Sequence, residues 1–200
     1  HMVNGVSESV DTQVLQSILS VQILWLKQEK DNFKSLGSIG KQIQRTGSLF
    51  LERNLWQEGN ELFLTLFRIQ NGIIEKPEFF KEMVIKIQEN LATKEMLETL
   101  VNNYFSPNNR QSESAESILT CLGRRSVIFC LNQLMRSENK DERVALIKLI
   151  PFSGNTAVPV LIDCLEKNPP WYVIRNVIYI VSEIGDSSVF SIIRPYASHK

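Results

Sequence analysis

Three glycines at equal spacing are the feature that most constrains the fold of this chain. Gly123, Gly154 and Gly185 lie 31 residues apart. Apolar residues recur around each glycine, five and four positions before it and four, seven, eight and eleven positions after it. In the first copy these are Ile118, Leu119, Val127, Cys130, Leu131 and Leu134, and apolar residues stand one and two periods later in each column. This agreement indicates an internal repeat.

The spacing within one repeat predicts two amphipathic helices. Apolar positions at steps of three and four on either side of the glycine lie on one face of a helix. A glycine tolerates the left-handed backbone that follows many helices, and Asn155 with Thr156, or Asp186 with Ser187, offers an oxygen to cap the next helix. A two-helix unit buries its apolar stripe only by stacking on neighbours. We therefore expect an all-α chain whose helical hairpins stack into an α-solenoid.

The repeat resembles HEAT repeats of the short bacterial kind also seen in phycobilisome-lyase-like proteins. The matching residues are Asp141-Glu142-Arg143, the block from Asn155 to Leu161, and the stretch from Trp171 to Asp186. The resemblance covers residues 93–200 and implies an α-α superhelix without specifying an activity. Two positions depart from the family pattern, because Ser112 and Ile174 occupy a column where the family carries arginine.

The first half of the chain predicts an irregular helical cap over residues 3–92. We expect helices at 8–30, 41–54, 57–73 and 78–91, with Gly37 and Gly40 breaking the pattern between the first two. The first helix is expected to place its apolar residues near one face; these are Val10, Val14, Leu15, Ile18, Val21 and Leu26. No stretch alternates with a period of two, so no strand is predicted.

The repeats are expected over residues 93–200, with the polar stretch 106–112 as a longer turn. The sequence stops at Lys200, shortly before the pattern would begin another helix, so we expect the array to continue in a longer protein. The last helix, with Val189, Ile192 and Ile193, should then expose apolar surface. That face is a possible site of self-association.

Composition narrows the classes of partner and compartment. The 200 residues are 43% apolar, enough for a real core, and 22 basic side chains balance 22 acidic ones. A broad positive field for nucleic acid is therefore not expected. Three cysteines, no signal peptide and no apolar stretch of membrane length favour a cytoplasmic protein that does not enter a membrane.

No motif predicts catalysis, a cofactor or a metal site. The cysteines form no CxxC pair and have no histidine nearby, so they are interpreted as small buried apolar residues. Carboxylate pairs one helical turn apart, such as Glu58 with Glu61, are interpreted as solvated helix faces. No phosphate-binding loop and no nucleophile elbow occurs. The sequence therefore predicts a non-enzyme.

Candidate partner-binding residues lie on the helix face that the core does not use. Lys148 from the second copy, with Arg175, Tyr179 and Ser182 from the third, should line the concave surface, and Trp171 should stand at a turn after two prolines. Structural roles are open alternatives for three of these residues. Arg175 could cap or brace the adjacent repeat, Tyr179 could merely pack against neighbouring side chains, and Trp171 could attach its helix to the preceding unit.

The leading function is a scaffold that binds a protein or peptide in this groove. The resemblance adds two alternatives, an accessory subunit of a phycobilin lyase and a HEAT-like DNA-binding protein. DNA binding would use a basic cluster, namely Arg124, Arg125, Arg136, Lys140, Arg143 and Lys148. Glu138, Asp141 and Glu142 neutralise part of that cluster, so nucleic acid is the less favoured partner.

Overall fold

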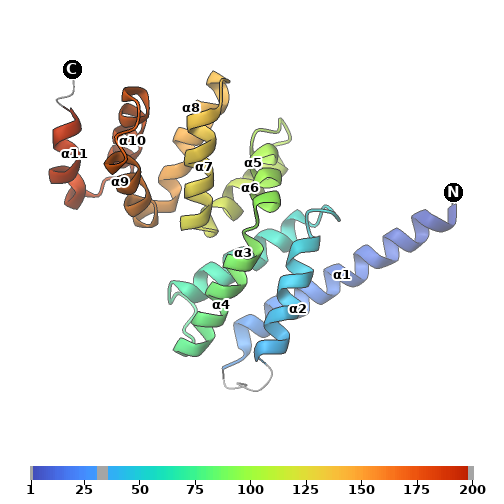
Figure 1. The fold of residues 1–200 in the computed structure, drawn as a ribbon. Helices are drawn as coiled ribbons and strands as arrows, with labels where there is room; N and C mark the ends of the chain where they lie inside the picture. Colours follow the sequence, from blue (N-terminus) through green and yellow to red (C-terminus); the bar gives the residue numbers. More distant parts are fainter. Residues whose placement is uncertain (1, 31–35, 198–200) are drawn as a thin grey trace. The chain divides into compact units, whose positions relative to one another are not determined.

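The computed structural model describes the backbone of residues 2–30 and 36–197 and, within them, the side chains of 11–30, 37–187, 189–191 and 193–196. All of its regular elements are helices, as Figure 1 shows, which confirms the all-α prediction. Among the described residues no single helix is long and apolar enough to cross a membrane. One pair bent by 110°, Lys140–Thr156 with Val158–Glu166, meets that standard only when the two are taken together.

The chain divides into two compact units, His1–Leu122 and Gly123–Lys200. The first unit contains α1 (Met2–Gln28), α2 (Leu36–Leu49), α3 (Trp56–Gln70), α4 (Glu78–Leu91), α5 (Lys94–Tyr104) and α6 (Asn109–Cys121). The second contains α7 (Arg124–Arg136), α8 (Lys140–Leu149), η1 (Ile150–Thr156), α9 (Val158–Glu166), α10 (Trp171–Ile184), η2 (Ser187–Val189) and α11 (Phe190–Ala197). The division falls at the first glycine of the repeat, so α5 and α6 belong to the first unit. The limits of the cap (3–92) and of the repeats (93–200) stay a prediction.

Helix α3 is the centre of the first unit. It packs against α1, α4 and α6, while α2 packs against α4 and α5 against α6. Its apolar side chains Leu62, Phe63, Leu66 and Ile69 are fully buried. Phe50, from the turn before α3, meets the rings of Trp56 and Phe63 edge-on, with centroids 6.0 and 5.9 Å apart. This aromatic cluster fixes the start of α3 against the end of α2.

Helix α1 corrects the expectation of a single apolar face. Leu15, Leu19, Ile23 and Leu26 are buried, whereas Val14, Ile18, Val21 and Leu24 are exposed. The helix therefore carries two apolar stripes, and only one packs on its own unit. Among the residues expected on one face, Leu15 and Leu26 are in the core, Val14, Ile18 and Val21 are not, and the Val10 side chain lies outside the described residues.

Helix α2 corrects the expected break at Gly37 and Gly40, because both glycines lie inside it. A Cβ added at Gly40 would meet the Met83 sulfur at 3.4 Å, and one at Gly47 would meet Leu62 at 3.1 Å and Leu91 at 3.2 Å. Gly40 and Gly47 thus let neighbouring helices approach α2 closely. The helix expected at 78–91 is confirmed as α4, and the turn expected at 106–112 is shorter, since α6 begins at Asn109.

Lys76 is a buried cation that closes the end of α1. Its Nζ donates hydrogen bonds to the carbonyl of Lys27, at 3.0 Å, and to that of Glu29, and it lies 4.9 Å from the centre of the Phe80 ring. Lys27 is the penultimate residue of α1 and Glu29 is the first residue after it, and carbonyls at the end of a helix lack helical partners. Burial, and then repulsion from Lys30, lowers the pKa of Lys76, while Glu29 partly offsets that shift.

Replacing Lys76 with methionine is expected to lower the free energy of unfolding of the first unit by about 1–3 kcal/mol, because the part-buried carbonyls of Lys27 and Glu29 lose their donor. Urea unfolding at pH 7 measures this loss. Since the pKa of folded Lys76 lies below its usual 10.5, the wild type should gain stability over the variant as pH rises toward 10.5. Lys81→Met is the control, because its exposed pair with Glu78 contributes less than about 1 kcal/mol. Equal losses for both variants would contradict the role of Lys76.

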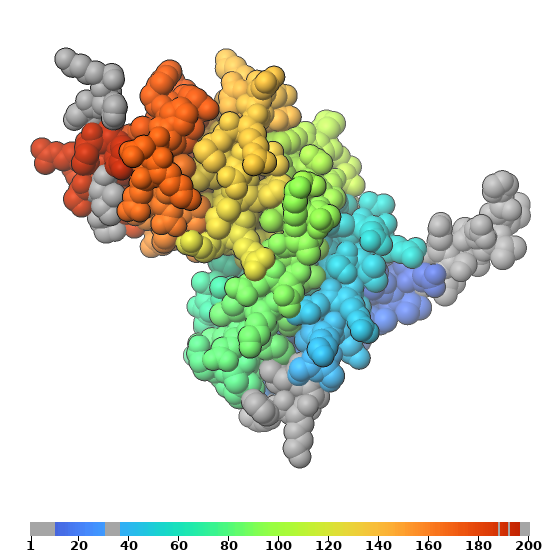
Figure 2. All heavy atoms as spheres, in the orientation of Figure 1, coloured from blue at the N-terminus to red at the C-terminus, as the bar shows by residue number. Residues whose placement is uncertain are grey.

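The repeat columns form the core of the second unit. Val127, Val158 and Val189, four residues after the three glycines, are all buried, as are the paired positions before Gly154 and Gly185. All three glycines have positive φ, but only Gly185 has the left-handed backbone expected after a helix. Gly123 (φ 56°, ψ −129°) and Gly154 (φ 53°, ψ −140°) share one conformation, whereas Gly185 is left-handed (φ 75°, ψ 18°) and ends α10. Figure 2 shows the helices of this unit as adjacent bands from yellow to red.

The ends of the repeat hairpins differ from two expectations. Helix α9 begins without a side-chain cap, so neither Asn155 nor Thr156 plays the capping role expected of it. Val189 is buried, so it does not belong to an exposed terminal face. Ile193 is half-buried, the side chain of Ile192 lies outside the described residues, and the large apolar side chain that α11 exposes is Phe190. Val189 ends η2, which connects α10 to α11.

The three cysteines are buried free thiols, as the sequence predicts. Burial raises the pKa of Cys121 and of Cys130 to about 12, and it also raises the pKa of Cys164. At pH 8 all three should stay protonated and covered, so we expect them to react with a coloured disulfide reagent only as fast as the protein unfolds. Absorbance recorded with and without urea measures both rates. Rapid reaction of even one thiol in the folded protein would contradict this prediction.

Candidate functional site

An open groove lies between α8 and α10 in the second unit. Its volume is about 340 Å³, and it is lined by Val144, Ile147 and Lys148 from α8 and by Arg175, Asn176 and Tyr179 from α10. Val144 lies three and four residues before Ile147 and Lys148, and Tyr179 lies four and three residues after Arg175 and Asn176, so each helix presents one face to the groove. Val144 and Tyr179 remain substantially exposed, and the Tyr179 side chain is 50% accessible to solvent. The groove therefore offers an apolar floor that its own unit does not cover.

The charge of this groove is positive. Lys148 and Arg175 contribute two cations, and no carboxylate lines the groove. Over residues 123–187, where every side chain is described, the one salt bridge joins Arg124 to Asp163, at 3.4 Å. Neither Lys148 nor Arg175 is in an ion pair there. Both cations are thus available to a carboxylate of a bound molecule, and Asn176 adds an amide that can donate and accept.

Trp171 lies one turn before Arg175 on the same face of α10. The Arg175 guanidinium sits over its indole ring, 5.2 Å from the centroid, in a cation–π contact. The Trp171 side chain is 68% exposed. That exposure argues against the alternative in which Trp171 attaches α10 to the preceding unit. The stacked ring instead restrains the guanidinium beside the groove.

The structure brings together three of the five predicted residues, Lys148, Arg175 and Tyr179, in the groove itself. Trp171 adjoins it through Arg175. Ser182 does not line it, and the Ser182 hydroxyl donates to the Tyr179 carbonyl at 2.7 Å within its own helix. The groove also contains Val144, Ile147 and Asn176. Ile147 and Asn176 were not predicted, although each is adjacent in sequence to a predicted residue.

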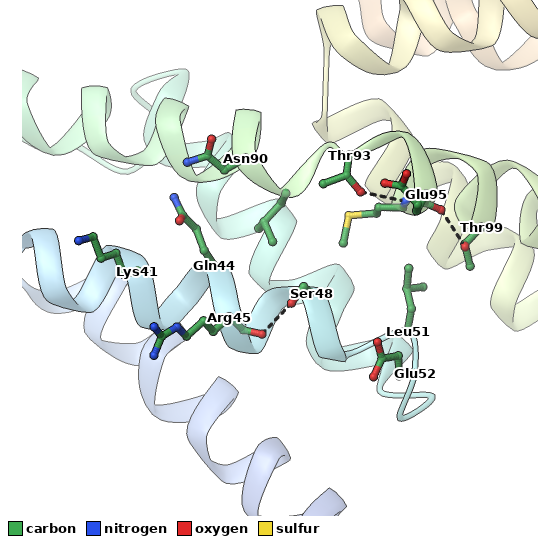
Figure 3. Close-up of a pocket in the computed structure, with 12 residues that line it drawn as sticks. Lys41, Gln44, Arg45, Ser48, Leu51, Glu52, Asn90, Thr93, Glu95 and Thr99 are labelled. Atoms are coloured by element: carbon green, nitrogen blue, oxygen red, sulfur yellow. Dashed lines mark hydrogen bonds between the residues drawn. The ribbon is translucent and has the colours of Figure 1, made fainter.

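A second pocket, in the first unit, was missed by the sequence analysis. It has a volume of about 610 Å³ and runs beside α2, the end of α4 and the start of α5. Figure 3 shows Lys41 and Arg45 toward one end and Glu52 and Glu95 toward the other. The lining residues are Lys41, Gln44, Arg45, Ser48, Leu51, Glu52, Asn90, Leu91, Thr93, Glu95, Met96 and Thr99.

The local hydrogen bonds of this pocket are structural. The Thr93 side chain accepts from the Met96 amide at 3.2 Å and so caps α5, and the Thr99 hydroxyl donates to the Glu95 carbonyl. A hydrogen bond from its own backbone, and then one from Thr93, lowers the pKa of Glu95. The spacing of Lys41, Gln44, Arg45 and Ser48 on one helix face was the available signal. These α2 residues lie beside residues 90–99 only because α2 packs against α4.

The described residues contain no group of three or more His, Cys, Asp or Glu that could hold a metal ion. The carboxylate pair noted in the sequence, Glu58 with Glu61, makes surface contacts instead. Glu58 accepts from Gln16, and Glu61 pairs with Lys27 at 2.6 Å. Comparison of the chain with family models, curated proteins and solved structures found no match in any of the three.

Proposed function

We propose that this chain is a non-catalytic scaffold that binds a protein or peptide in the α8–α10 groove. The observation that carries the proposal is the convergence of Lys148, Arg175 and Tyr179, which the repeat register had placed on one side, around an apolar floor without acidic residues. Tyrosine and arginine are the residue types that most often anchor interfaces. A peptide that combines apolar side chains with carboxylates fits this groove best.

The proposal includes the architecture of the second unit. Two features support HEAT-like hairpins stacked as an α-solenoid, with the groove on the concave face. The apolar columns of the repeat are buried, and Gly123 and Gly154 share one backbone conformation. In such an array the second face of each hairpin is free for a partner. The groove is formed by α8 and α10, the equivalent helices of two successive hairpins.

Selection from a displayed peptide library tests this function and needs no known partner. The library is panned on the wild-type chain, and the recovered peptides are resynthesised and titrated by fluorescence anisotropy. We expect peptides rich in Asp and Glu beside apolar residues, with dissociation constants that weaken as salt screens the charges. Recovery of no binding peptide, or only of peptides that bind an Arg175→Glu variant equally well, would contradict the proposal.

A further inference from the structure

The outer face of α1 is an apolar stripe that no other element of the first unit covers. Val14, Ile18, Val21 and Leu24 are between 41 and 66% exposed. Their spacing of four, three and three residues places them on one side of the helix, roughly opposite the buried stripe that packs on α2 and α3. A solvent-exposed surface on which apolar residues are concentrated in this way marks a site of association.

The chemistry of the stripe indicates what covers it. The fifteen residues from Thr12 to Leu26 include no charged side chain, and Asp11 and Lys27 flank them. A charged partner finds no complementary charge on these fifteen residues. A second copy of the same helix, in contrast, offers a surface that is equally neutral and apolar. A twofold axis allows a patch to contact itself, residue i meeting j while j meets i.

The flanking charges favour an antiparallel orientation over a parallel one. With an axis at the level of residue 19, antiparallel helices bring Val14 of one copy beside Leu24 of the other, and Ile18 and Val21 meet near the axis. Asp11 then lies at the level of Lys27 of the other copy, although Lys27 also pairs with Glu61 of its own chain. A parallel arrangement would place Asp11 beside Asp11 and Lys27 beside Lys27.

We propose that α1 mediates an antiparallel homodimer through Val14, Ile18, Val21 and Leu24. Four half-exposed side chains per copy form a smaller patch than most stable interfaces bury. The dimer is therefore weak and concentration-dependent. It is independent of the proposed function, because it uses the other unit and a different chemistry.

Sedimentation equilibrium over a concentration series reaching about 1 mM tests the dimer. The mass of the wild type should rise from 23.0 kDa toward twice that value. Val21→Glu should weaken self-association by at least about 10-fold. Ile73→Glu is the matched control, since Ile73 is equally exposed, at 67%, and lies in the loop before α4; it should associate as the wild type does. Circular dichroism verifies that both variants fold. A wild type that stays monomeric, or a Val21→Glu that dimerises unchanged, would overturn the proposal.

Complementary variants test the orientation. Val14→Glu and Leu24→Lys should each weaken the homodimer, and an equimolar mixture should restore association, because antiparallel pairing places residue 14 beside residue 24. A mixture of Val14→Glu with Val14→Lys should not restore it, since residue 14 meets its own counterpart only in a parallel pair. Restoration by the second mixture rather than the first would refute the antiparallel arrangement.

Discussion

Replacing Gly59 with alanine is expected to destabilise the first unit by about 2–3 kcal/mol, although alanine favours a helix by about 1 kcal/mol over glycine. A Cβ at this position would lie 2.3 Å from a ring carbon of Phe50 and within 2.7 Å of two more. Phe50 is fully buried, and Trp56 and Phe63 meet its ring edge-on. The ring can therefore move away from the added Cβ only by displacing Trp56, Phe63 or other packed neighbours.

Urea unfolding followed by tryptophan fluorescence measures this effect. In a Trp171→Phe background the signal comes only from Trp25 and Trp56, both in the first unit. Gly37→Ala is the control, because nothing lies within 4 Å of the added Cβ, and we expect no loss of stability there. Adding Phe50→Leu to Gly59→Ala should recover part of the loss. If Gly59→Ala unfolds at the wild-type urea concentration, the ring is less confined than the packing indicates.

Replacing Tyr179 with alanine, or Arg175 with glutamate, is expected to weaken binding of the selected peptides by at least about 30-fold, equivalent to about 2 kcal/mol. Tyr179→Ala removes the aromatic part of the groove floor. Arg175→Glu puts a carboxylate where the groove now has a cation and also removes the stacking on Trp171. Both residues are exposed, so the variants should fold and unfold as the wild type does.

Two matched controls separate the groove from the rest of the surface. Tyr172→Ala removes a tyrosine of similar exposure from the same helix, at a position that does not line the groove. Arg194→Glu makes the same change of charge on α11. Fluorescence anisotropy should give both controls the wild-type dissociation constant. Equal weakening by Tyr172→Ala and Tyr179→Ala would place the binding surface outside the groove.

The repeat could be predicted from sequence because its signal is periodic and its physics is local. An apolar residue that recurs at one offset from a glycine must face the same neighbour in each copy, and Val127, Val158 and Val189 are buried as that periodicity requires. The same register placed Lys148, Arg175 and Tyr179 on one side. The repeat register does not predict that the Ser182 hydroxyl bonds to a carbonyl of its own helix, because that hydrogen bond depends on the side-chain rotamer.

Other features of the fold depend on tertiary contacts that a pattern does not encode. Helix α1 is apolar on two sides, so periodicity alone does not say whether Leu15 or Val14 enters the core. Gly40 was interpreted as a break, but inside α2 it permits contact with Met83. The pocket of the first unit joins residues 41–52 to residues 90–99, and no local spacing relates those two segments.

The backbone at the three repeat glycines limits how the repeats can diverge. Gly123 and Gly154 occupy a region, near φ 55° with ψ between −129° and −140°, that side-chain-bearing residues are sterically denied. Gly185 occupies the left-handed helical region, which asparagine also visits. The first two junctions therefore tolerate no substitution without rebuilding the turn. The junction at Gly185 can accept another residue, such as asparagine, while its hairpin keeps the same shape.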